Sequence, residues 1–276
     1  RGNKVWDKTF GGITYDEAYS LIQTTDGGYA VAGWTVSYGA GNYDFWVIKL
    51  DSRGNKVWDK TFGGITYDRA YSLIQTIDGG YAVAGFTISY GAGWGDFWVI
   101  KLDSRGNKVW DKTFGGIKYD KAYFLIQTID GGYAVAGYTR SYGAGNHDFW
   151  VIKLDSRGNK LWNKTFGGSA DDRAYSLIQT TDGGYAVAGY TRSYGAGGAD
   201  FWLIKLDSRG NKVWDKTFGG SDRDYALSLI QTTDGGYAVA GYTESYGAGD
   251  YDFWVIKLDS KGNEVWDKTF EGRIQA

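Results

Sequence analysis

The residues of this chain best suited to chemistry are two series of aspartates, each repeated five times at one spacing. The first series precedes a short apolar stretch in each repeat and comprises Asp16, Asp68, Asp120, Asp172 and Asp224. The second follows a Ser-Tyr-Gly-Ala-Gly segment and comprises Asp44, Asp96, Asp148, Asp200 and Asp252. If the fold gathers these carboxylates around one opening, they could hold Ca²⁺ or accept hydrogen bonds from sugar hydroxyls. Alternatively, each caps amides of its own loop. We favour capping for the second series and leave both roles open for the first.

A series of tyrosines beside glycines adds a second kind of candidate contact. It comprises Tyr38, Tyr90, Tyr142, Tyr194 and Tyr246. An exposed tyrosine over a glycine-lined floor could stack on a sugar ring, and it could equally anchor its loop. The single histidine, His147, has no imidazole partner, and we expect it to be a solvated loop residue. The absence of cysteine excludes thiol nucleophiles, disulfides and the usual structural zinc sites.

Composition excludes several classes of partner. The chain carries 30 Lys and Arg against 32 Asp and Glu, so its charge does not attract nucleic acid. Its apolar runs are far shorter than the roughly 20 residues that span a bilayer. Aromatic residues make up 18% of the chain, which indicates a folded protein. The sequence opens without Met or a signal peptide, which we interpret as a mature, trimmed or excised segment.

The whole chain is a tandem repeat. The opening Arg-Gly-Asn-Lys-Val-Trp returns from Arg53 to Lys261 at a constant step of 52 residues. Each unit contains four strand-like stretches, A to D, which in the first unit are residues 19–24, 29–35, 44–50 and 56–62. Gly-rich turns join A to B and C to D, so these pairs are antiparallel. Repeated four-stranded antiparallel units predict an all-β, five-bladed β-propeller, with Trp46 and Trp58 and their copies in its core.

Counting strands predicts the blade boundaries. Stretches A, B and C occur five times and D six times, within a single domain over residues 1–276. The expected blades span about residues 13–62, 65–114, 117–166, 169–218 and 221–270. The D sequences at Lys4–Phe10 and Glu264–Phe270 therefore compete for one position. We expect the N-terminal copy to close the ring, although either could. The other copy is free to pair with a neighbouring molecule.

Strands C and D carry a family resemblance. The segment Val47-Ile-Lys-Leu-Asp-Ser-Arg-Gly-Asn-Lys-Val-Trp58 resembles the blade motif of quinoprotein (PQQ-like) propellers. Its turn is one residue shorter than theirs, and those enzymes have eight blades, so the resemblance implies the fold and not the dehydrogenase activity. The whole repeat is similar to uncharacterised prokaryotic surface or secreted propeller-repeat proteins with Asp-Gly-Gly-Tyr and Lys-Leu-Asp patterns. That similarity implies an extracellular or cell-surface location.

Differences among the repeats lie in the D–A and B–C connections, which should emerge on one face. Loops tolerate change, so relaxed constraint explains this pattern and we favour that explanation. The functional interpretation is a non-enzymatic binding protein without a cofactor, whose loops engage glycans or a protein partner. A self-assembling scaffold, associating through the spare terminal strand, is the first alternative. A glycoside-acting enzyme is the second, although near-identical blades oppose the different carboxyl environments that glycosidases need.

Overall fold

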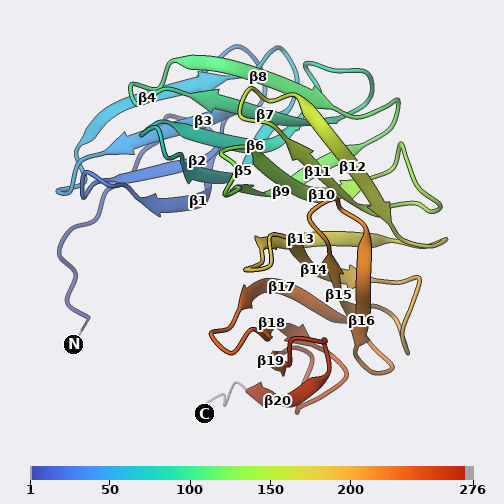
Figure 1. Cartoon of the computed structure of the whole chain (residues 1–276). Coiled ribbons are helices and arrows are strands. Elements are labelled where there is room, and N and C mark those ends of the chain that lie inside the picture. Colours follow the sequence, from blue (N-terminus) through green and yellow to red (C-terminus); the bar gives the residue numbers. More distant parts are fainter. Residues whose placement is uncertain (1, 271–276) are drawn as a thin grey trace. The chain divides into compact units, whose positions relative to one another are not determined.

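The computed structural model describes residues 2–270, which form twenty β-strands and no helix (Figure 1). Each blade is one antiparallel sheet whose strands follow in chain order. The sheets comprise β1 (Asp16–Gln23), β2 (Tyr29–Thr35), β3 (Asp44–Leu50) and β4 (Lys56–Phe62); β5 (Asp68–Gln75), β6 (Tyr81–Thr87), β7 (Asp96–Leu102) and β8 (Lys108–Phe114); β9 (Asp120–Gln127), β10 (Tyr133–Thr139), β11 (Asp148–Leu154) and β12 (Lys160–Phe166); β13 (Asp172–Gln179), β14 (Tyr185–Thr191), β15 (Asp200–Leu206) and β16 (Lys212–Phe218); β17 (Asp224–Gln231), β18 (Tyr237–Thr243), β19 (Asp252–Leu258) and β20 (Glu264–Phe270). The predicted five four-stranded sheets are confirmed.

Glycines with positive φ make both hairpins of a blade. Gly27, at φ 78°, turns β1 into β2, and Gly54, at φ 77°, turns β3 into β4. At the second turn the Asp51 carboxylate accepts hydrogen bonds of 2.8 Å from the N–H groups of Arg53 and Asn55. A side chain other than glycine is strained at positive φ, so these residues fix where each strand ends.

The first strand of each blade begins three residues before the position predicted from sequence. A β-bulge between Ala18 and Ser20 interrupts the pairing of β1 with β2, and the same irregularity recurs in β5, β13 and β17. Because the bulge breaks the alternation of apolar and polar residues, the segment before it does not look like a strand in the sequence. The bounds of the other three strands match the prediction.

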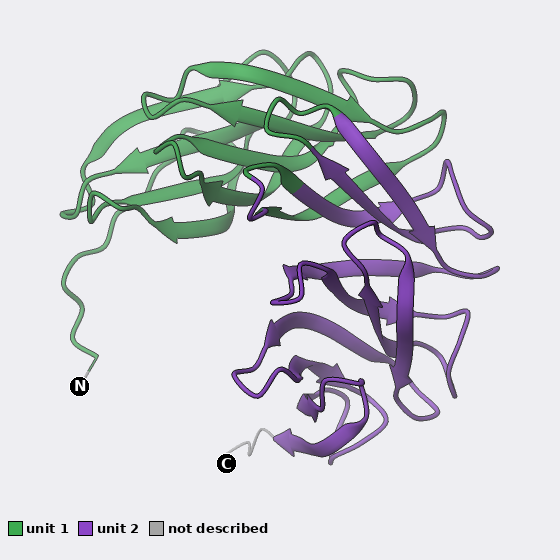
Figure 2. Ribbon diagram, viewed as in Figure 1, with its two compact units in different colours: residues 1–127, 131–133, 155–159 green, residues 128–130, 134–154, 160–276 purple. Residues whose placement is uncertain are grey.

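The chain divides into two compact units, residues 1–127, 131–133 and 155–159, and residues 128–130, 134–154 and 160–276 (Figure 2). Within each unit, neighbouring sheets pack face to face around aromatic side chains. In the first unit the Trp58 ring lies 5.5 Å from that of Tyr81, at an angle of 74°. Trp46 is buried, and Trp98 is 2% exposed. The core position predicted for the Trp46 series is therefore confirmed. In the Trp58 series, Trp58 packs half-buried against the next blade, whereas the terminal copies Trp6 and Trp266 are 36% and 43% exposed, so the prediction fails for them.

The two terminal copies of strand D differ in their pairing. Glu264–Phe270 forms β20 and pairs with β19, so the expectation that the N-terminal copy would fill this position is wrong. The hairpin at Gly262 holds the C-terminal copy beside β19, which gives it the higher effective concentration. Residues 4–10 form no strand, and Trp6 and Phe10 lie against the first blade.

Candidate functional site

The D–A and B–C connections of a blade lie together, as predicted. In the first blade the Tyr38 hydroxyl donates a 2.9 Å hydrogen bond to the Gly11 carbonyl, and the Thr14 N–H donates to Ser37 Oγ at 3.2 Å. A Cβ added at Gly12 would come within 2.5 Å of Ser37 Cβ, so glycine is needed for this approach. We call the two connections of one blade its loop site. The tyrosine contact recurs in the loop sites of the second, fourth and fifth blades.

The first aspartate series holds each loop site from inside. One Asp68 oxygen accepts from the Thr87 hydroxyl, and the other accepts from Ser89 Oγ at 2.7 Å and the Gly64 N–H at 2.9 Å. Asp68 is fully buried, as are its copies Asp120, Asp172 and Asp224. Both carboxylate oxygens are thus engaged by the loops. These contacts support the capping role, and binding of a ligand by these residues stays a prediction.

In the first blade this carboxylate is more accessible. Asp16 accepts from the Thr35 hydroxyl, from Ser37 Oγ at 2.8 Å and from the Gly12 N–H at 2.9 Å. Burial raises the pKa of Asp16, but these hydrogen bonds outweigh it and hold the pKa below its usual value. The group is therefore a carboxylate at neutral pH.

The second aspartate series is buried beneath the B–C loop. One Asp44 oxygen accepts from the N–H groups of Ala40 at 2.9 Å and Gly41 at 3.2 Å. The other is buried without a hydrogen-bond partner, as is one oxygen in each of Asp96, Asp148 and Asp252. Burial raises the pKa of Asp44, and the nearby charge of Asp68 adds to that rise. Asp200 accepts from the Ala196 and Gly197 N–H groups in the same way.

The tyrosines are the most exposed of the candidate residues. Tyr38, Tyr90, Tyr142, Tyr194 and Tyr246 are 43–47% exposed. The Tyr90 ring lies 5.2 Å from Trp98, and its hydroxyl donates to the Gly63 carbonyl at 2.8 Å. The ring is therefore fixed at its hydroxyl and supported from below, with part of its surface open to a ligand.

Large apolar side chains stand out from the variable positions. In the first unit Ile13, Tyr15, Ile65, Trp94 and Ile117 are between 68% and 102% exposed. Ser169 in the fourth blade and Ser221 in the fifth stand at the position that Ile13 occupies in the first. The loop sites therefore share an internal framework and differ in the surface that they show.

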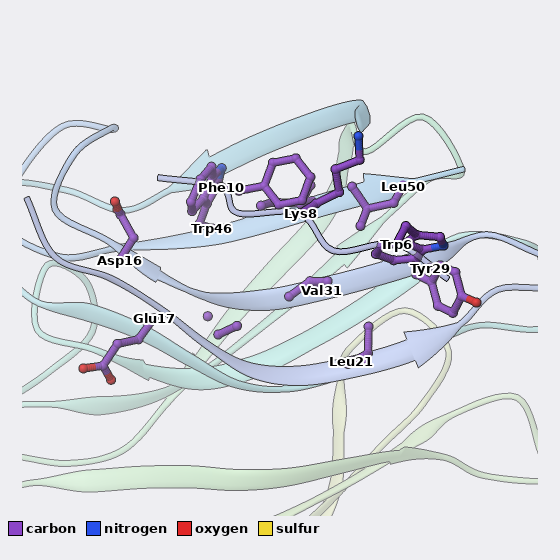
Figure 3. A pocket seen from close by; sticks show the side chains of 13 residues that line it. Trp6, Lys8, Phe10, Asp16, Glu17, Leu21, Tyr29, Val31, Trp46 and Leu50 are labelled. Atoms are coloured by element: carbon purple, nitrogen blue, oxygen red, sulfur yellow. The ribbon is translucent and has the colours of Figure 1, made fainter. Parts of the chain in front are cut away.

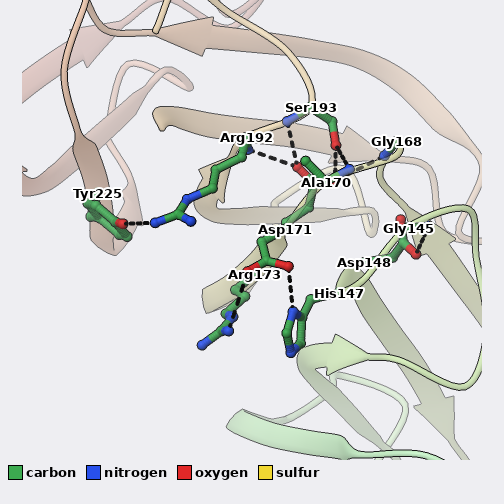
Figure 4. Close-up of polar contacts among 11 residues, drawn as sticks. Gly145, His147, Asp148, Gly168, Ala170, Asp171, Arg173, Arg192, Ser193 and Tyr225 are labelled. Carbon is green, nitrogen blue, oxygen red and sulfur yellow. Dashed lines mark hydrogen bonds and ion pairs between the residues drawn. The ribbon is translucent and has the colours of Figure 1, made fainter. Parts of the chain in front are cut away.

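His147 lies in a polar cluster (Figure 4). Its Nδ1 is 2.7 Å from Asp171 Oδ1, and the Arg173 guanidinium lies 3.7 Å from the other Asp171 oxygen. The imidazole also packs edge-on against Tyr138, with centroids 4.5 Å apart. Its side chain is only 13% exposed, so the expectation of a solvated loop histidine is wrong. Burial lowers the pKa of His147 below its usual value, despite the hydrogen bond to Asp171.

A cavity of about 440 Å³ lies between residues 6–10 and the sheet face of the first blade (Figure 3). Its walls are mainly apolar, with Asp16 and Glu17 at one end, and include Trp6, Phe10, Leu21, Tyr29, Trp46 and Ile48. Residues 2–270 contain no group of three or more His, Asp or Glu side chains placed to hold a metal ion. Nor does this part of the chain contain a helix long and apolar enough to cross a membrane.

Comparison with known proteins supports the fold. Among solved structures, 92% of the chain aligns with 66% of the WD40 domain of Pan2 from Neurospora crassa, at a TM-score of 0.58 and 12% identity. Sqt1 from Chaetomium thermophilum aligns over 93% of this chain and 62% of its own, at a TM-score of 0.54 and 14% identity. A protein of unknown function from Bacteroides caccae aligns over 92% of this chain and 82% of its own, at a TM-score of 0.52 and 14% identity. The fold is a five-bladed β-propeller.

Sequence comparison is less specific. No protein-family model matches the chain. The regulatory protein FlaEY of Caulobacter vibrioides is 25% identical over 261 residues, which cover 82% of this chain. The alignment includes 26% of FlaEY, so the chain spans about a quarter of that protein's length.

Sequence reasoning missed one lysine–aspartate ion pair in each blade, in which the lysine side chain is 5–14% exposed and the aspartate side chain 55–64% exposed. Lys101 Nζ lies 2.9 Å from Asp78 Oδ2, and its side chain is 6% exposed. The aspartates of this series lie in the turn between strands A and B, where an aspartate needs no other role, so their positions alone do not indicate an ion pair. The lysine near the end of each strand C could have indicated this pair, because a lysine in an otherwise apolar and buried strand needs a counter-charge.

Proposed function

We propose that the chain is a non-enzymatic binding protein whose loop sites engage glycans at a cell surface or outside the cell. The observation that carries this proposal is the repeated tyrosine platform. Each tyrosine ring rests beside a buried tryptophan, and in four blades its hydroxyl donates to a glycine carbonyl of the D–A loop. A ring held in this way gives up little conformational entropy when a ligand stacks on it.

The carboxylates support binding more than catalysis. A glycosidase needs one carboxyl group that donates a proton and one that attacks or activates water, both in contact with the substrate. The candidate carboxylates of the second to fifth blades are at most 4% exposed, and most of their oxygens accept hydrogen bonds from loop groups. They suit the positioning of a loop. The exposed tyrosines then supply the contact with the ligand.

Several equivalent sites also suit a multivalent ligand. One aromatic contact contributes about 1 kcal/mol beyond its buried area. Single sites would therefore bind weakly and combine through avidity on a surface that displays many glycans. The loop sites could also contact a protein partner through the exposed residues Ile65 and Trp94.

The test is a glycan array, followed by titration calorimetry on any glycan that binds. We expect a stoichiometry of several ligands per chain. Replacing all five platform tyrosines by alanine should weaken each site about fivefold or more, the equivalent of about 1 kcal/mol. Ile77→Ala is the matched control, because Ile77 is 86% exposed in the turn between β5 and β6. A protein that binds no glycan, or binds one per chain independently of the tyrosines, contradicts the proposal.

A further inference from the structure

Neighbouring blades meet through two different faces. In the first unit the first blade contributes Phe45, whose ring lies 4.7 Å from Trp98 of the next blade. We call the contributing surface the donor face; in the first blade it comprises Ile22, Ala30, Ala32, Phe45, Val47, Trp58 and Phe62. The receiving surface is the acceptor face; in the second blade it includes Tyr81, Val83, Trp98, Ile100 and Leu102. The same pairing occurs in the second unit, where Phe201 lies 4.7 Å from Trp254.

Within the first unit, residues 4–10 and no blade cover the acceptor face of the first blade. Its residues are Tyr29, Val31, Trp46, Ile48 and Leu50, and the N-terminal segment lies on them. The Trp6 ring is 5.6 Å from Tyr29 and Trp58 is 5.5 Å from Tyr81, so Trp6 copies the contact of strand D. Nothing in residues 4–10 copies the Ala, Phe and Val side chains of strands B and C. The 440 Å³ cavity lies over Val31, Trp46, Ile48 and Leu50, whose counterparts in the second blade pack against those side chains (Figure 3).

Within the second unit, no blade covers the donor face of the last blade. Phe253 is 74% exposed, whereas its counterparts Phe45, Phe97, Phe149 and Phe201 are at most 1% exposed. Ile230 and Trp266 on the same face are 57% and 43% exposed. One chain thus has a donor face on its last blade and an acceptor face on its first blade. Within each unit, faces of these two kinds pack against each other.

We propose that the donor face of the last blade of one copy docks on the acceptor face of the first blade of a second copy. Phe253 would then take the place over Trp46 that Phe45 takes over Trp98. Trp266 would contact Tyr29 and displace Trp6. Such an interface joins two different surfaces, so it adds copies head to tail. The match with the interface inside each unit supports a second copy of this chain as the partner, and closure onto the same chain is the alternative that cross-linking separates from it.

Two glutamates weaken this contact. Inside the second unit the Arg192 guanidinium donates a 3.2 Å hydrogen bond to the Tyr225 hydroxyl of the next blade. The residues at the corresponding positions of the docked pair are Glu244 and Glu17. In the second blade, the position of Glu17 holds Arg69, whose guanidinium lies 5.1 Å from the centroid of the Trp34 ring in the blade before it. Glu17→Arg therefore replaces a repulsion with a favourable charge and a ring contact.

Cysteine cross-linking tests which chain supplies the donor face. The Thr25 N–H donates to Gln75 Oε1 at 2.8 Å across the first pair of blades, and the corresponding residues of the docked pair are Thr233 and Gln23. The chain has no cysteine, so Gln23→Cys and Thr233→Cys each introduce a single thiol. We expect an oxidised mixture of the two variants to give a disulfide-linked pair of chains that neither variant gives alone. If the mixture gives no cross-link, the proposal is overturned. A disulfide within one chain of the variant that carries both cysteines would instead show that the last blade docks on the first blade of the same chain, which also overturns the proposal.

Sedimentation velocity tests the interface itself. We expect a concentration-dependent dimer or longer assembly, strengthened about tenfold by Glu17→Arg and weakened about tenfold by Phe253→Asp, each shift corresponding to about 1.4 kcal/mol. Both residues are exposed, so neither change disturbs the folded blade. Ile77→Asp is the matched control. A chain that stays monomeric even with Glu17→Arg overturns the proposal. The tyrosine variants of the loop sites should leave assembly unchanged, so failure of glycan binding and failure of docking are distinguishable.

Discussion

Lys101 and Asp78, the ion pair of the second blade, should differ sharply in what their removal costs in stability. Lys101 Nζ lies 3.0 Å and 2.9 Å from the two Asp78 oxygens and 2.9 Å from the Leu102 carbonyl. The lysine side chain is 6% exposed, whereas the aspartate side chain is 61% exposed. Removing Asp78 therefore strands a buried ammonium, while removing Lys101 leaves a carboxylate that water can solvate.

The magnitudes follow from this asymmetry. Removing one partner of a buried pair costs about 3–5 kcal/mol, because the other charge is left uncompensated. Because Asp78 is exposed, water can reach the Lys101 ammonium once the carboxylate is gone, so we expect Asp78→Ala to lower the free energy of unfolding by about 2–3 kcal/mol. Lys101→Met keeps the length and the apolar stem, and Asp78 keeps its hydrogen bonds from Thr76 and the Gly80 N–H, so its cost is about 0–1 kcal/mol. The double variant should be as stable as Lys101→Met alone.

Urea unfolding of the three variants, followed by tryptophan fluorescence, measures these free energies and completes a double-mutant cycle. Asp234→Ala in the last blade is the matched control, because the side chain of its partner Lys257 is 14% exposed and should tolerate the loss better. If Lys101→Met destabilises the protein as much as Asp78→Ala does, the buried ammonium is not the dominant cost and the reasoning fails.

Three further predictions concern acid stability and the termini. Burial raises the pKa of Asp78, but hydrogen bonds from Thr76, Lys101 and the Gly80 N–H outweigh it and lower the pKa to about 2. Since the unfolded value is about 3.9, this stabilisation is present above about pH 4 and disappears as the pH falls through about 2, and Asp78→Asn should flatten that part of a pH titration of Tm. Trp58→Ala should cost about 2–3 kcal/mol in urea unfolding, whereas Trp6→Ala, at a residue 36% exposed, should cost less than about 1 kcal/mol. Deleting residues 2–10 should leave the circular dichroism spectrum unchanged and, by uncovering the acceptor face, raise self-association in sedimentation; loss of the β signal would show that the segment is not redundant.

The sequence predicted the sheets well because its signals are local. A glycine at a positive-φ turn and a run of β-branched and aromatic residues fix strands B, C and D to the residue. Strand A was predicted to start at Tyr19, although β1 starts at Asp16, because the bulge at Ala18 breaks the alternation on which the prediction depended. Local pattern thus predicts regular pairing and misses its interruptions.

The loop sites were harder to predict because their contacts join distant residues. Asp68 binds Thr87 and Ser89, about twenty residues later, and those partners are recognisable only once β5 and β6 are paired. His147 and Asp171 belong to successive blades and meet through the packing of those blades. Composition and spacing identified the repeated aspartates but could not show that most of them are buried.

The division between constant and variable residues has a physical basis that bears on function. The residues that bind the loops together, such as Asp68 and Ser89, are repeated in all five blades, since losing any of their hydrogen bonds leaves buried amides or hydroxyls without partners. The variable positions, such as Ile13 and Trp94, project into solvent, where substitution costs little. A ligand that recognises the constant tyrosine platform should therefore occupy several blades of one chain. A partner that recognises the variable side chains should bind at one position. The stoichiometry of binding therefore distinguishes recognition of the tyrosines from recognition of the variable side chains.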